Sequence, residues 1–191
     1  MLRAGDGPVS TWSVPNLISF VRILLVPVFV AVLLAGADGG PVRWAATVLF
    51  VVAISTDSLD GHLARSRNLV TDLGKILDPI ADKALTGAAL VVLSVLGELP
   101  WWVTALVLLR EVGITVYRFA VLSKRVIPAS KGGKLKTVLQ SVAITLALAP
   151  LPALLGDWMN AVNAVVMGAA FLVTLVTGVQ YLIDDRRLNR G

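Results

Sequence analysis

The sequence predicts an all-α integral membrane protein with six transmembrane helices and both termini in the cytoplasm. Of its 191 residues, 57% are hydrophobic and only 15% are charged, whereas soluble domains average about 25% charged residues. Apolar runs long enough to cross a bilayer recur along the chain, and none alternates in the manner of a barrel strand. Because lipid offers the backbone no hydrogen-bond partners, we expect these runs to be helices.

Each predicted helix corresponds to one apolar run. The first run, 17–34, is interrupted only by Ser19, Arg22 and Pro27. It is longer than the core of a cleaved signal peptide and carries a charge, so we expect a retained helix. The other five runs cover residues 42–63, 77–96, 101–122, 137–155 and 162–183. Each run suits a hydrocarbon core of about 30 Å at a rise of about 1.5 Å per residue.

The chain is expected to form one domain, residues 1–191, with residues 1–13 as a flexible N-terminal segment. It contains no cysteine, and no linker, low-complexity tract or fixed-period repeat divides it. The net charge is +5, but the basic residues flank apolar segments and do not form one long run. We therefore expect the bilayer, through its anionic headgroups, and an anionic substrate as partners, and no nucleic acid.

Basic residues also indicate the orientation in the membrane. The loops opposite the termini hold only Arg43. The segments on the side of the termini hold fourteen basic residues, namely Arg3, Arg22, Arg65, Arg67, Lys75, Lys83, Lys124, Arg125, Lys131, Lys134, Lys136, Arg186, Arg187 and Arg190. The positive-inside rule thus predicts a multi-pass protein of the cell membrane with the termini in the cytoplasm. Trp44, Trp101, Trp102 and Trp158 then fall at the outer interface, where indole rings prefer to lie.

The segment 57–82 carries five of the twelve acidic residues, although its flanks are apolar. Asp57 and Asp60 are three residues apart, and Gly74, Asp78 and Asp82 are spaced by four, so each set lies along one helical face. We expect Asp72 to lie in the loop between the two helices and to be solvated.

Facing carboxylates would repel one another unless a cation lay between them. Ligand sets made only of oxygen favour Mg²⁺ or Mn²⁺, with Ca²⁺ as an alternative. The spacing therefore predicts metal-assisted chemistry on a phosphate at the cytoplasmic face. A single aspartate can instead be paired with lysine or solvated, and an ion or proton pathway also uses buried aspartates. Transport sites, however, lie near the bilayer midplane, often within inverted repeats, and no repeat is visible here.

The spacing Asp57-x2-Asp60-Gly61-x2-Ala64-Arg65-x8-Gly74-x3-Asp78-x3-Asp82 resembles the signature of the CDP-alcohol phosphatidyltransferase family. The resemblance implies two divalent metal ions, held by the aspartates and by the diphosphate of a CDP-linked lipid, CDP-diacylglycerol. It implies that an acceptor hydroxyl displaces CMP and that the family domain covers most of the chain. It also implies a homodimer.

The same resemblance assigns roles to positions of this chain. Asp57, Asp60 and Asp78 would be metal ligands, and Asp82 would be both the general base and a ligand. The nucleotide end of the CDP-lipid would be lined by Gly61, Ala64, Arg65 and Gly74.

The acceptor must be recognised outside this motif. The segments 14–16, 78–83 and 129–137, together with Arg110-Glu111 and Gln140, resemble the branch of the family whose acceptor is sn-glycerol 3-phosphate. A phosphorylated acceptor needs cations, and the candidates are Arg110, Arg118, Lys131, Lys134 and Lys136. Adjacent helical residues point about 100° apart and pair poorly, so we expect Arg110 to bind phosphate and Glu111 to contact another helix. The lysines are equally explained by the positive-inside rule alone.

Other functions remain as alternatives at this point. Within the family, these are a cardiolipin synthase that uses phosphatidylglycerol, and synthases that use inositol phosphate or serine. Intramembrane prenyltransferases also bind Mg²⁺-diphosphate through aspartates, but they usually carry two separate aspartate motifs and this chain has one. A small transporter is the alternative that is not an enzyme.

Overall fold

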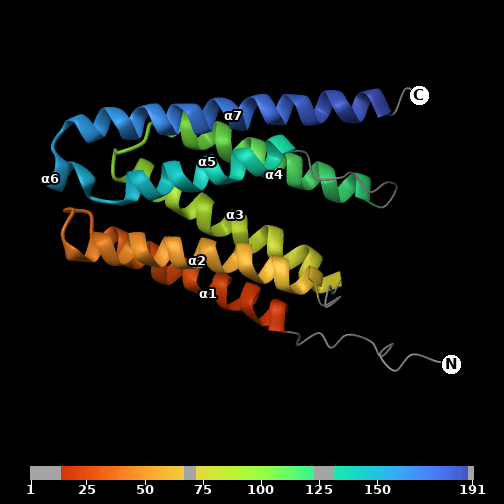
Figure 1. Ribbon diagram of the computed structural model, residues 1–191, viewed down its shortest axis with the longest axis horizontal. Coiled ribbons are helices and arrows are strands. Elements are labelled where there is room, and N and C mark those ends of the chain that lie inside the picture. The colour runs from red at the N-terminus through yellow and green to blue at the C-terminus, as the bar shows by residue number, and fades with distance from the viewer. Residues whose placement is uncertain (1–13, 67–71, 123–130, 189–191) are drawn as a thin grey trace.

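The computed structural model describes residues 14–66, 72–122 and 131–188, and every element within these ranges is helical (Figure 1). The elements are α1 (Val14–Ala35), α2 (Pro41–Ser66), α3 (Asp72–Val95), α4 (Trp101–Leu122), α5 (Lys131–Leu148), α6 (Leu151–Leu155) and α7 (Trp158–Leu188). The all-α prediction is confirmed for this part of the chain.

The long helices run alongside one another, and the bundle has two distinct ends (Figure 1). At the motif end, α1 begins, α2 ends at Ser66, α3 begins at Asp72 and α7 ends. At the tryptophan end, α2, α4 and α7 begin, and these helix starts carry the exposed side chains of Trp44, Trp101, Trp102 and Trp158. The predicted separation of tryptophans from the aspartate motif is therefore present along the bundle axis.

Two groups of helices share one apolar core. Helix α1 packs against α2 and α3, α5 packs against α7, and α4 joins the groups by contacting both α3 and α7. In the first group, the rings of Phe29 on α1 and Phe50 on α2 lie with centroids 5.7 Å apart. Fully buried side chains continue the core into α3 and α5, including Leu85, Leu93, Ile144 and Leu148.

The outer surface is apolar as well. Large hydrophobic side chains point outward on most helices, and Leu109 on α4 and Val165 on α7 are each 71% exposed. Soluble proteins rarely expose extended apolar surface of this kind. Within the described ranges, two segments are long and apolar enough to cross a membrane by themselves, Leu17–Ala35 and Trp158–Tyr181.

Six such segments were expected. Of the other expected segments, Pro41–Thr56 on α2 is apolar but shorter within the described residues.

Most helix boundaries differ by a few residues from the expected ones, and the largest differences are in α5. The predicted helix over 137–155 ends at Leu148, and the short helix α6 follows from Leu151. Pro150 explains this break, because proline disfavours helical conformation in the preceding residue. At the other end, α5 already begins at Lys131.

Asp72 was expected in a loop, but it is the first residue of α3.

The turn between α1 and α2 requires glycine at position 36. A Cβ atom at Gly36 would lie 2.6 Å from the backbone nitrogen of Arg43 and 2.9 Å from its Cα. The start of α2 thus packs directly on this turn, which positions the buried Arg43 side chain. That side chain donates through Nε to the carbonyl of Leu148 at 2.8 Å and pairs with Glu98.

We expect Gly36→Ala to destabilise the bundle by about 1–3 kcal/mol, because the added methyl group must displace backbone and cannot be relieved by turning a side chain. The measurement is the midpoint of thermal unfolding of the purified protein in detergent. Gly168→Ala is the matched control, since no atom lies within 4 Å of a Cβ at that helical position. Equal midpoints for the two variants would contradict the predicted clash.

Candidate active site

Helices α2 and α3 carry the aspartate motif. Helix α2 is continuous through Ser66, so Asp57, Asp60, Gly61, Ala64 and Arg65 occupy consecutive turns of one helix. Helix α3 likewise carries Gly74, Asp78 and Asp82. Of these eight side chains only that of Asp82 is among those the structure describes. The metal and nucleotide roles assigned to the other seven lie outside the described side chains and stay predictions.

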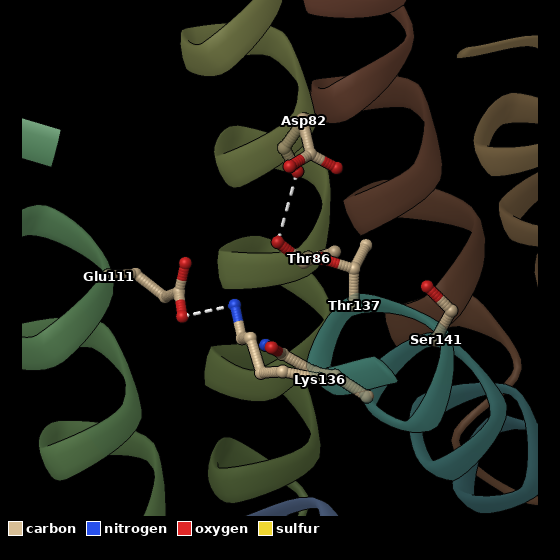
Figure 2. Close-up of a pocket in the computed structure, with 7 residues that line it drawn as sticks. Asp82, Thr86, Glu111, Lys136, Thr137 and Ser141 are labelled. Carbon is tan, nitrogen blue, oxygen red and sulfur yellow. Dashed lines mark hydrogen bonds and ion pairs between the residues drawn. The ribbon is translucent and has the colours of Figure 1, made fainter. Parts of the chain in front are cut away.

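Asp82 lines a small pocket formed by three helices (Figure 2). The lining residues are Asp82 and Thr86 from α3, Glu111 from α4, and Lys136, Thr137, Gln140 and Ser141 from α5. The space is about 10 Å³, which is room for roughly one water molecule. Apart from Asp82 and Glu111, every group that faces it is a cation, a hydroxyl or an amide. The pocket is therefore polar, with two carboxylates, one ammonium group, three hydroxyl groups and one amide.

Glu111 is the centre of an ion-pair cluster at this pocket. It pairs with Lys83 through Oε2 and with Lys136 through Oε1. Its Oε1 also accepts from Nη1 of Arg110 at 2.9 Å. The side chains of Glu111 and Lys136 are only 5% and 8% exposed. Burying a charge is unfavourable unless it is paired, and here one carboxylate is the shared partner of three cations.

The pairing of Arg110 corrects one expectation. We expected neighbouring positions on α4 to pair poorly and Glu111 to contact another helix. Glu111 does contact α3 and α5, but Arg110 also pairs with it. The guanidinium group has a long, flexible stem, and attraction between charges is much stronger in a buried site than in water. These two effects overcome the unfavourable helical angle.

Arg110 also extends toward α7. Its Nη2 donates to Oγ1 of Thr177 at 3.4 Å, and a Cβ atom at Gly178 would lie 3.0 Å from its Nε. The glycine therefore leaves the space that the guanidinium group occupies between α4 and α7. Through this arginine, the cluster connects α7 to the three helices of the pocket.

The remaining predicted acceptor-binding cations are placed differently. Lys134 is exposed and does not line the pocket, whereas Lys136, two residues later, is buried in it. The side chains of Arg118 and Lys131 lie outside the described residues. The structure thus brings Asp82, Arg110 and Lys136 to one region and leaves Lys134 apart from them.

Two pocket residues were not singled out from the sequence. Thr86 follows Asp82 by one helical turn, and its hydroxyl donates to the Asp82 carbonyl at 3.0 Å. Ser141 follows Thr137 by the same spacing. A polar stripe with a spacing of four residues on an otherwise apolar helix was the signal that could have identified both. Lys83 was counted as a basic residue of the cytoplasmic side and as part of the segment 78–83, but it was given no role in the site.

A larger cavity of about 590 Å³ lies at the tryptophan end. Its lining is mainly apolar and comes from the start of α7, the end of α5 and the turns nearby, together with the Arg43–Glu98 pair. This cavity is at the opposite end of the bundle from the aspartate motif, and the one carboxylate that lines it is already paired. We therefore assign the chemistry to the smaller pocket.

No group of three or more potential metal ligands occurs among the described side chains. The three other motif aspartates are outside that set, so the predicted metal site is represented here by Asp82 alone.

An aspartate motif split between two helices, next to a buried cluster of cations, is suited to the transfer of a phosphate-linked group. Comparison with known families identifies the class. The family model described as CDP-alcohol phosphatidyltransferase matches residues 12–176, and the chain belongs to this family. The predicted family is confirmed, and the protein is a transferase.

Named relatives narrow the comparison further. The chain is 48% identical over 168 residues to a probable phosphatidylglycerophosphate synthase of Mycobacterium tuberculosis. The matched region covers 87% of this chain and 78% of the relative. It is 37% identical over 182 residues to the CDP-diacylglycerol–glycerol-3-phosphate 3-phosphatidyltransferase of Bacillus subtilis, covering 89% and 93%. The protein of the same name from Shigella flexneri is 37% identical over 185 residues, covering 92% and 96%.

Proposed function

We propose that this protein transfers a phosphatidyl group from CDP-diacylglycerol to sn-glycerol 3-phosphate, giving phosphatidylglycerophosphate and CMP in phospholipid biosynthesis. Family membership supports the reaction type, and the names of the relatives support the acceptor. The structural observation that supports a phosphorylated acceptor is the cation cluster beside Asp82. Three cations around one carboxylate leave an excess of positive charge, which a phosphate group would balance.

The proposed metal site uses the carboxylates of Asp57, Asp60, Asp78 and Asp82. A set of carboxylate oxygens is the chemistry that Mg²⁺ or Mn²⁺ prefers, and two ions are proposed by resemblance to the family. When bound, such ions neutralise charge on a diphosphate and on the departing nucleotide. Gly61, Ala64, Arg65 and Gly74 are proposed to line the CDP-lipid side of the site.

The residues of the chain supply positioning and proton transfer. The acceptor phosphate is held by Arg110 and Lys136. Asp82 takes the proton from the acceptor hydroxyl. The oxygen of that hydroxyl bonds to the phosphorus of the phosphatidyl group, and the bond from this phosphorus to CMP breaks. The hydroxyl groups of Thr86, Thr137 and Ser141 line the same pocket and can hydrogen-bond the remaining glycerol hydroxyl.

We propose that α1 to α5 and α7 cross the cell membrane, with α6 at the outer face. The motif end then lies in the cytoplasm with both termini, and the four tryptophans mark the outer interface. The basic residues near the motif end, the tryptophans at the other end and the apolar outer surface support this orientation. A homodimer is proposed by family resemblance alone.

A release assay for CMP tests the proposed reaction. Purified protein with CDP-diacylglycerol and Mg²⁺ should release CMP with sn-glycerol 3-phosphate, and much less with phosphatidylglycerol, inositol phosphate or serine. Asp82→Asn should lower turnover at least about a hundredfold, the range expected for loss of a general base. CMP release with phosphatidylglycerol as the preferred acceptor would instead indicate a cardiolipin synthase.

The two lysines at the start of α5 give a matched comparison. Lys136→Ala should raise the KM for glycerol 3-phosphate at least about tenfold, because a hydrogen bond to a charged group contributes about 1.5–3 kcal/mol. The KM for CDP-diacylglycerol should stay within about a factor of two, as expected when only acceptor binding is lost. Lys134→Ala should have the smaller effect, since that side chain is exposed. The opposite ranking would assign the phosphate to Lys134.

The orientation can be measured by labelling single cysteines, since the natural chain has none. Asp157 precedes α7 and Asp184 lies near its end, and both are exposed. In intact cells, a membrane-impermeant maleimide should label Asp157→Cys, and it should label Asp184→Cys only after the membrane is permeabilised. The reverse pattern would contradict a cytoplasmic motif end.

A further inference from the structure

Glu111 is the one acidic side chain in the described part of the pocket that the proposed reaction leaves without a role. We propose that Glu111 is a positioning residue that holds Lys83, Arg110 and Lys136 as one phosphate-binding group. Its negative charge sets the net charge of this group to one that suits a phosphate monoester. The inference rests on the proposed function, because it concerns the acceptor of that reaction.

The first argument is geometric. The three cations come from three helices, α3, α4 and α5, and among the described side chains Glu111 is the anionic partner that all three share. Oε1 receives Arg110 and Lys136, and Oε2 receives Lys83, so both carboxylate oxygens are used. Figure 2 shows the pair of Glu111 with Lys136. Without this anion, three positive charges in a small volume would repel one another. Glu111 therefore determines where the ammonium groups of two other helices lie.

Burial gives the second argument. Lys136 is almost fully buried, and an unpaired ammonium group in such a site is strongly unfavourable. An ammonium group has three N–H donors, however, and a guanidinium group has five. One hydrogen bond from each cation to Glu111 leaves donors that can bind a ligand. The same carboxylate can thus keep the cations in the pocket and leave them able to bind phosphate.

The third argument is the charge of the cluster. Three cations and one carboxylate give the cluster a net charge of two positive units, not counting Asp82, which lines the same pocket and is proposed to bind metal. A phosphate monoester carries about −1.5 to −2 at pH 7, which matches this excess. A phosphodiester such as phosphatidylglycerol carries one negative charge, and an alcohol without phosphate carries none. Glu111 would therefore favour a phosphate monoester as the acceptor over the other two classes.

The test separates positioning from a purely structural role. Glu111→Gln keeps the size and one oxygen acceptor but removes the charge. We expect the KM for glycerol 3-phosphate to rise at least about tenfold, which corresponds to about 1.4 kcal/mol of lost acceptor binding. The KM for CDP-diacylglycerol should change less than about twofold. Glu111→Asp, which restores the charge on a shorter side chain, should recover part of the acceptor affinity.

Glu98→Gln is the matched control, because it removes the carboxylate of the Arg43–Glu98 pair at the tryptophan end. It should lower the midpoint of thermal unfolding and leave both KM values unchanged. A Glu111→Gln variant with an unchanged or lower KM for glycerol 3-phosphate would overturn the inference. So would an equal rise in both KM values.

Two further results keep the outcomes distinct. If Glu111→Gln does not yield folded protein, Glu111→Asp and Lys83→Gln are measured instead, and each should raise the acceptor KM selectively. Unchanged acceptor KM values in both would overturn the inference. If the natural protein releases no CMP with any phosphate monoester, the proposed function itself fails. If the natural protein is active and the variants have unchanged KM values for glycerol 3-phosphate, only the inference about Glu111 is refuted and the proposed function stands.

Discussion

The arrangement of the site depends on a buried carboxylate shared by three cations. Glu111 lies in the middle of an apolar helix, where an isolated charge would be strongly unfavourable. Its ion pairs reach α3 and α5, and Arg110 extends the network to α7. Four helices are therefore connected by polar contacts near the chemistry, while the remainder of the core is held by apolar packing such as that of Phe29 and Phe50.

This division between polar and apolar contacts follows the axis of the bundle. The motif end carries the aspartates and the cation cluster, and the tryptophan end carries the large apolar cavity and one separate ion pair, Arg43–Glu98. Mutations at the two ends should thus be separable in their effects, because side chains that are far apart and share no partners act almost additively. If residues at the motif end determine the reaction type and the acceptor, residues at the tryptophan end can change without altering the chemistry.

Much of this organisation is predictable from the sequence, because it depends on local patterns. Apolar runs gave the helices, and the spacing of Asp57, Asp60, Asp78 and Asp82 gave both the helical faces and the family. The break at Pro150 could have been read from the sequence, since proline disfavours the helical state of the preceding residue. We instead treated 137–155 as one span because its hydropathy continues through the break.

The contacts of the pocket were harder to predict, because they depend on how distant helices pack. No pattern in the sequence distinguishes Lys134 from Lys136, yet one is exposed and the other buried. The pairing of Arg110 with its neighbour Glu111 follows from the low polarity of the surroundings and not from helical geometry. Lys83 acquires a role only because α4 places Glu111 opposite it.

The small volume of the pocket has a consequence for how the protein binds its acceptor. A space that holds about one water molecule cannot admit a phosphate group until side chains turn or α3 and α5 separate. Binding of a phosphate group beside Asp82 is therefore coupled to such a movement, and part of the energy of binding is used for it. The apparent affinity for the acceptor is reduced by the fraction of molecules that are open at any moment. Weak acceptor binding would then reflect the free-energy cost of this movement and not poor contacts with the bound phosphate.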